Sequence, residues 1–83
     1  MEPKVVNLFE ADVDPGYNGP VFSLESSDLD CNCLRFDRGE GVPLHINADV
    51  DVAGVVLEGE GLLQVDGQQH LLSDGDFFYV PRG

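Results

Sequence analysis

The fold is decided by residues 61–83, which read GLLQVDGQQHLLSDGDFFYVPRG. Three short stretches rich in Leu, Val, Phe and Gln alternate here with glycine turns at 66–67 and 74–76. The Asp-Gly pair between Val65 and Gln68 predicts a tight hairpin, because both central positions of a type I′ turn need positive φ. We therefore predict strands at 62–65, 68–72 and 77–80.

The rest of the chain repeats this pattern of short apolar stretches and turns. Turn signals recur at 14–16, 18–20, 26–28, 37–39 and 59–61. They bound further predicted strands at 5–9, 21–25, 30–36, 42–47 and 52–58. No window places apolar residues at helical spacing for three turns. The 83 residues therefore predict a single all-β domain, over residues 1–83, of the sandwich or barrel class.

The charge balance excludes several classes of partner. Sixteen acidic and four basic side chains give a formal net charge of −12. Four basic side chains cannot neutralise many phosphates. We therefore expect no nucleic-acid binding and no docking on anionic membranes. The hydrophobic share of 42% is too high for a disordered acidic tail. No apolar run is long enough to span a bilayer and no signal peptide opens the chain, so we expect a cytoplasmic protein.

The two cysteines, Cys31 and Cys33, lie one residue apart. On a strand their side chains point to the same side. A disulfide between them would close too small a loop to stabilise a fold. Reduced, packed thiols are the simpler interpretation, and a metal-binding or redox Cys-x-Cys pair is the alternative.

Residues 41–83 resemble the cupin family of small β-barrels. Gly75, Pro81 and Gly83 match the opening of the family's second motif, Gly-x5-Pro-x-Gly. His45 matches the first histidine of the first motif, and Gly59 matches its closing glycine. The resemblance implies a double-stranded β-helix, or jelly-roll barrel, whose inward-facing ligands hold one metal ion. It also implies that this barrel is incomplete at its C-terminal end.

The sequence departs from the family's ligand set at several positions. Asn47 stands where the second histidine belongs, and its uncharged amide is a poor metal ligand. Val52 stands at the glutamate position counted back from Gly59, with Asp51 one residue away. Alternation slightly favours Asp51 for the inner face, because Ala53, Val55 and Leu57 would share it, whereas the family spacing favours Val52. A bulge would reconcile the two.

His70 is the second histidine of the chain and shares a strand face with Leu72. It could supply a second imidazole, or it could be a partly buried structural residue. The candidate ligand-binding residues are therefore His45, Asn47, Asp51 and His70. No metal site is assigned and no cofactor is expected, since a catalytic metal usually needs three protein ligands. A metal bound here would be Fe, Ni, Mn or Zn.

Three functions compete. The first is a non-catalytic barrel that holds a small polar ligand weakly at His45 and Asn47, or holds none. The second is a metal-dependent cupin enzyme, a dioxygenase or sugar isomerase, in which His45 and Asp51 are helped by His70 or by a partner-subunit residue. The third is a structural or regulatory domain that acts by dimerising.

The missing final strands predict a partner. Open sheet edges pair readily with another chain. We therefore expect a homodimer, with strand exchange through residues 5–9. The abrupt C-terminal end is equally consistent with a fragment of a longer protein.

Overall fold

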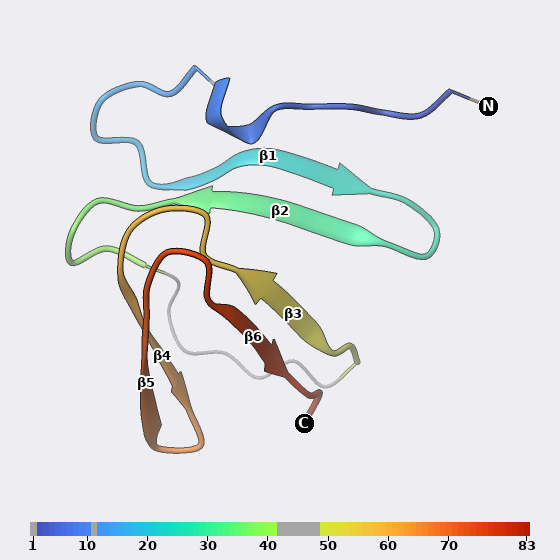
Figure 1. Cartoon of the computed structure of the whole chain (residues 1–83). Helices are drawn as coiled ribbons and strands as arrows, with labels where there is room; N and C mark the ends of the chain where they lie inside the picture. The colour runs from blue at the N-terminus through green and yellow to red at the C-terminus, as the bar shows by residue number, and fades with distance from the viewer. Residues whose placement is uncertain (1, 11, 42–48) are drawn as a thin grey trace. The chain divides into compact units, whose positions relative to one another are not determined.

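A computed structural model describes residues 2–10, 12–41 and 49–83 of the chain. Its elements are one 3-10 turn and six strands, in the order η1 (Leu8–Glu10), β1 (Gly19–Glu25), β2 (Asp30–Arg35), β3 (Val52–Val55), β4 (Gly61–Val65), β5 (Gln68–Leu72) and β6 (Phe77–Val80) (Figure 1). The strands form three antiparallel ladders, β1–β2, β3–β6 and β4–β5. The expectation of an all-β chain is confirmed for the described residues. The chain divides into two compact units, Met1–Pro43 and Leu44–Gly83, which we call the N-terminal and C-terminal units.

The N-terminal unit is built on the β1–β2 hairpin. The pairing runs from Gly19 opposite Arg35 to Glu25 opposite Asp30, and its register shifts between Pro20 and Phe22. Phe22, Leu24, Cys31 and Cys33 are the half-buried partners across this ladder. The prediction that the two cysteines share one face is confirmed, and both are free thiols.

The predicted strand at residues 5–9 is wrong. Leu8–Glu10 form a 3-10 turn instead, and the residues before it form no ladder. The Asn7 carboxamide accepts a hydrogen bond from the Phe9 amide at 2.9 Å, and the Asn7 carbonyl accepts one from Glu10 at 3.2 Å. These local bonds turn the backbone away from an extended conformation. Val5 is 90% exposed, so no strand among the described residues covers its side chain.

The C-terminal unit consists of two antiparallel pairs of strands, and one pair is inserted in the chain between the two strands of the other. β3 pairs with β6, and the β4–β5 hairpin lies between them in the chain (Figure 1). Val55 lies opposite Phe77. The pairing continues past it, because the Val56 amide donates to the Asp76 carbonyl at 2.9 Å and the Gly75 amide donates to the Val56 carbonyl at 2.7 Å. The predicted strand 52–58 is therefore shorter than expected and ends before the turn at Gly59, whose φ is 103°.

The hairpin prediction at 66–67 is confirmed. Asp66 has φ of 50° and Gly67 has φ of 77°, and Val65 pairs with Gln68 across the turn. Both positive values are those of a type I′ turn. β5 and β6 have the predicted bounds, and β1, β2 and β4 begin or end within two residues of them. The predicted strand at 42–47 lies outside the described residues.

The two faces of the β3–β6 ladder differ in burial. Gly54, Phe78 and Val80 are half-buried, whereas Val55 and Tyr79 on the other face are exposed. Among the described residues no side chain is fully buried. No helix in the described ranges is long and apolar enough to cross a membrane.

Candidate functional site

The four residues that the sequence singles out fall in different places. His45 and Asn47 lie outside the described residues. Asp51 precedes β3, and His70 lies on β5. Asp51 and His70 therefore belong to different ladders of the C-terminal unit.

Asp51 is held by residues of β6 and of the segment that follows it. The Arg82 amide donates a hydrogen bond to Asp51 Oδ1 at 2.9 Å, and the Arg82 Nε lies 3.9 Å from the same oxygen. The Tyr79 hydroxyl also donates to the Asp51 carboxylate. These contacts follow from the register, because Val52 lies opposite Val80 and so brings the start of β3 to the end of β6. We call these three residues the Asp51 cluster.

The contacts in the Asp51 cluster shift two pKa values in opposite directions. The Arg82 amide, followed by the Tyr79 hydroxyl, lowers the pKa of Asp51 below its ordinary 3.8. The hydrogen bond to Asp51 raises the pKa of Tyr79 above its ordinary 10.0, and partial burial and the carboxylate charge add to this. Both shifts favour a charged carboxylate beside a neutral phenol. The Asp51 cluster therefore anchors the end of the β3–β6 ladder.

The ladder places Asp51 on the exposed side. Asp51 precedes Val52, so it shares a face with Ala53 and Val55. Alternation favours that face for the interior. The structure instead half-buries Gly54 and Val56, which lie on the side of Val52, while Val55 is exposed. On that side the Phe78 ring lies against Gly54, which has no side chain of its own to hold the ring away.

His70 lies opposite Leu63 across the β4–β5 ladder. It shares a face with Leu72, as the sequence predicts, because the two residues are two positions apart on one strand. Leu63 and Leu72 are half-buried and His70 is exposed. Within residues 2–10, 12–41 and 49–83, no three His, Cys, Asp or Glu side chains gather where they could hold a metal ion.

Two further carboxylates hold the loops that join the ladders. Asp74 accepts a hydrogen bond from the Gly59 amide and so links the β3–β4 loop to the β5–β6 loop. Asp76 accepts one from the Ser73 amide at 2.8 Å and closes the turn before β6. These acidic residues therefore fix loop conformation as well as adding charge.

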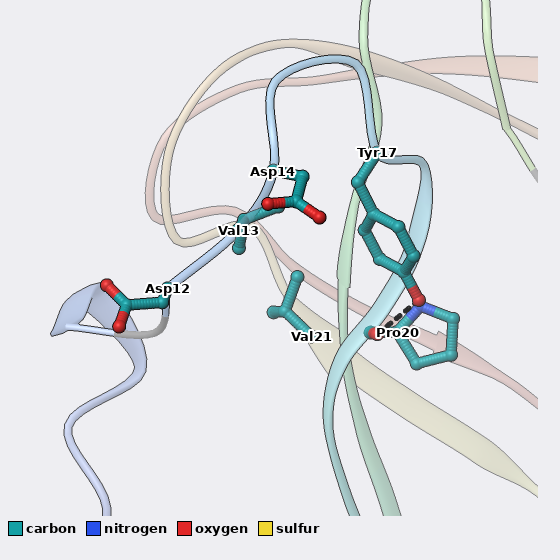
Figure 2. A pocket seen from close by; sticks show the side chains of 6 residues that line it. All are labelled: Asp12, Val13, Asp14, Tyr17, Pro20 and Val21. Atoms are coloured by element: carbon teal, nitrogen blue, oxygen red, sulfur yellow. Dashed lines mark hydrogen bonds between the residues drawn. The ribbon is translucent and has the colours of Figure 1, made fainter.

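An open hollow of about 520 Å³ lies in the N-terminal unit. Figure 2 shows its lining, which is Asp12, Val13, Asp14, Tyr17, Pro20 and Val21. The Tyr17 hydroxyl donates to the Pro20 carbonyl at 2.8 Å, so it is engaged within the chain. The hollow offers two exposed carboxylates and no further polar group directed at a ligand.

Sequence reasoning missed two members of the Asp51 cluster. The sequence motifs single out neither Tyr79 nor Arg82. The signal that could have found them is the pairing of β3 with β6, because an antiparallel register with Val52 near Val80 brings all three residues together. The sequence alone does not state which strands pair.

Comparisons with known proteins point to one family. Residues 33–83 match the profile of the family described as "Cupin domain". Fifty residues are 37% identical to the Quercetin 2,3-dioxygenase of Bacillus subtilis (strain 168), which is 60% of this chain and 15% of that protein. Fifty residues are 36% identical to an "Uncharacterized protein" of Aquifex aeolicus (strain VF5), which is 60% of this chain and 40% of that protein. The matched region thus spans less than half the length of either relative. No solved structure matches the chain.

Proposed function

The chain belongs to the Cupin domain family, and from that membership we propose that it is a small-ligand-binding member of the family that works without a bound metal. His45 and Asn47 would supply the polar contacts to the ligand. The family assignment and the all-β architecture confirm the expectation drawn from the sequence motifs. That the protein binds no metal is our proposal, and it rests on the contacts that the candidate metal ligand Asp51 makes.

The Asp51 cluster is the observation that supports the proposal. Asp51 stands beside the family's glutamate position, which is Val52 here, and it is the nearest carboxylate that could replace that glutamate. Its carboxylate already accepts hydrogen bonds from the Arg82 amide and the Tyr79 hydroxyl. A metal ion at Asp51 would share this carboxylate with the positively charged Arg82 guanidinium, 3.9 Å from Oδ1, and an imidazole alone falls short of the three protein ligands that a catalytic metal usually has.

Metal content tests this proposal with the two histidines as a matched pair. Wild-type chain, His45→Ala and His70→Ala are loaded in turn with Fe(II), Ni(II), Mn(II) and Zn(II), desalted, and analysed by plasma mass spectrometry. We expect the three proteins to retain the same small amount of each metal, because only surface carboxylates would hold it. One equivalent of metal in the wild type that His45→Ala removes would overturn the proposal.

Ligand binding is followed at the same side chain. The imidazole signals of His45, assigned by comparison with His45→Ala, are recorded by NMR while neutral sugars and amino acids are added. We expect saturable shifts of the His45 signals with at least one compound, and no matching shifts of His70. Shifts confined to His70, or no shift at either histidine, would contradict a ligand site at His45 and Asn47.

A metal-dependent enzyme is the alternative, favoured by the 37% identity to the B. subtilis quercetin 2,3-dioxygenase. In that case His45 and Asp51 would hold Fe, Ni, Mn or Zn together with His70 or a residue of a partner subunit. Asp51→Asn separates the two proposals, because it removes a metal ligand in the second and leaves the ligand contacts intact in the first. Loss of metal in both His45→Ala and Asp51→Asn would establish the metal site that the enzyme alternative requires.

A further inference from the structure

Two Asp-Gly pairs lie in turns of the C-terminal unit. Asp66-Gly67 joins β4 to β5, and Asp74-Gly75 lies between β5 and β6. In such a pair the glycine amide nitrogen can attack the side-chain carboxyl carbon of the aspartate, because a glycine has no Cβ to hinder the approach and its backbone turns freely. All four residues are exposed. The two pairs therefore share one chemistry and differ only in their surroundings.

The Asp74-Gly75 pair is held at both of its reacting groups. The Asp74 carboxylate accepts a hydrogen bond from the Gly59 amide. The Gly75 amide donates to the Val56 carbonyl at 2.7 Å. The carboxyl carbon and the nitrogen that would attack it are thus bound to separate partners, and the turn must open before they can meet.

The Asp66-Gly67 pair is free at both groups. It forms the turn at the end of the β4–β5 hairpin (Figure 1), with φ of 50° and 77°. The pairing of Val65 with Gln68 closes this turn without using the Asp66 carboxylate or the Gly67 amide. Across residues 2–10, 12–41 and 49–83, neither of these two groups has a hydrogen-bond partner. The nucleophile and the carboxyl group it attacks are therefore both available.

We propose that Asp66 is a site of spontaneous isomerisation to isoaspartate and that the second turn protects Asp74 from the same reaction. The Gly67 nitrogen bonds to Asp66 Cγ, and the carboxyl hydroxyl leaves with the amide proton as water, which gives a cyclic imide. Water then adds back at one of the two imide carbonyls. Opening at the backbone carbonyl leaves the chain running through Cγ, which is isoaspartate, and opening at Cγ restores aspartate. Nothing is oxidised or reduced, and the mass of the product equals that of the starting chain.

The product changes the hairpin because isoaspartate adds a methylene group to the backbone. A type I′ turn joins its strands through two residues whose backbone twist matches that of the strands. A longer backbone at Asp66 does not fit this turn. We therefore expect isomerisation to weaken the pairing of β4 with β5.

Peptide mapping of aged protein tests the proposal with the two pairs as a matched comparison. The wild-type chain is incubated in slightly acidic buffer, folded and in parallel in concentrated guanidinium chloride. Isoaspartate is located by chromatographic separation of the peptides and electron-transfer dissociation. Circular dichroism establishes that the first sample stays folded.

Asparagine variants give a second readout, because the carboxamide forms the same imide with loss of ammonia and so records the reaction as a change of mass. Asp66→Asn and Asp74→Asn place Asn-Gly in each turn, and the carboxamide oxygen at 74 can still accept the hydrogen bond. Asn18, which also precedes a glycine, is the reference within each chain. It accepts from the Asp37 amide at 2.6 Å and donates to the Gly16 carbonyl at 3.1 Å.

We expect isoaspartate to form at Asp66 in the folded chain at least about 10-fold faster than at Asp74, because two hydrogen bonds of ordinary net strength must break at the second site. In guanidinium chloride the two rates should be equal. Folded Asp66→Asn should deamidate at 66 faster than at Asn18, and faster than Asp74→Asn does at 74. Equal rates at 66 and 74 in the folded chain, a faster rate at 74, or no reaction at 66 in a chain that reacts when unfolded would overturn the proposal.

Discussion

Gly54 is the glycine of the C-terminal unit at which an added methyl group would meet the closest neighbouring atoms. It lies opposite Phe78 in the β3–β6 ladder. A Cβ added at Gly54 would lie 2.3 Å from Phe78 Cζ, 2.7 Å from Cε1 and 2.9 Å from Cε2. The Phe78 ring therefore lies over the glycine, and Gly54→Ala must push it away.

The cost follows from two opposing terms. Forcing an extra methyl group into a packed site costs typically about 1–3 kcal/mol. Replacing a strand glycine by alanine stabilises the folded state by about 0.5–1 kcal/mol, because alanine loses less backbone entropy on folding. The net loss of unfolding free energy should thus be about 1 kcal/mol, and at most about 2.5 kcal/mol. Gly61→Ala is the matched control, because a Cβ at Gly61 meets nothing within 4 Å, and it should be neutral or slightly stabilising.

Urea unfolding, followed by circular dichroism, measures the unfolding free energy of each variant. Phe78→Ala and the Gly54→Ala/Phe78→Ala double variant complete a double-mutant cycle. Without the ring, alanine at 54 has room, so Gly54→Ala should stabilise the Phe78→Ala background by about 0.5–1 kcal/mol. The entropy gain is then the same in both backgrounds, and the cycle should give a coupling energy equal to the steric cost, about 1–3 kcal/mol. A Gly54→Ala cost that persists unchanged without the ring, or that equals the effect of Gly61→Ala, would refute the packing argument.

Three further predictions concern the Asp51 cluster and the turns. Asp51 has a lowered pKa, so its contribution to stability is present above pH 3.8 and is lost as the pH falls through its pKa in the folded state. The urea midpoint of Asp51→Asn should therefore lie below that of the wild type at pH 6, and the two midpoints should converge in strong acid. Tyr79 has a raised pKa, so Tyr79→Phe should lower stability below pH 10.0 and converge with the wild type at higher pH. Gly67→Ala forces a side chain into φ of 77° and should cost about 1–2 kcal/mol in urea unfolding; an unchanged midpoint would contradict the type I′ turn.

The elements that the sequence predicts well are those bounded by glycine turns. β5 and β6 have the predicted bounds because Asp66-Gly67 and Asp74-Gly75 each favour one local geometry. The segment at 5–9 looks like a strand by composition, but the side chain of Asn7 captures the Phe9 amide and starts a turn. Two local hydrogen bonds to Asn7 thus override a weak strand preference.

The candidate site is less predictable, because it depends on which strands pair and which face turns inward. Both faces of β3 and β6 are apolar, as VAGV and FFYV show, so alternation favours Asp51 over Val52 only slightly. The pairing of β3 with β6 settles the environment of Asp51, since it brings Tyr79 and Arg82 to its carboxylate. A long-range contact of this kind has no signature in the spacing of nearby residues.

The claim that the His45 side chain serves a ligand and not a metal has one most direct test. Crystals of the protein grown in the presence of Fe(II), Ni(II), Mn(II) or Zn(II) are measured at the absorption edge of each metal. We predict no anomalous peak at bonding distance, ~2.0–2.1 Å, from either ring nitrogen of His45. A strong peak there, completed by two or more further protein ligands, would contradict the account.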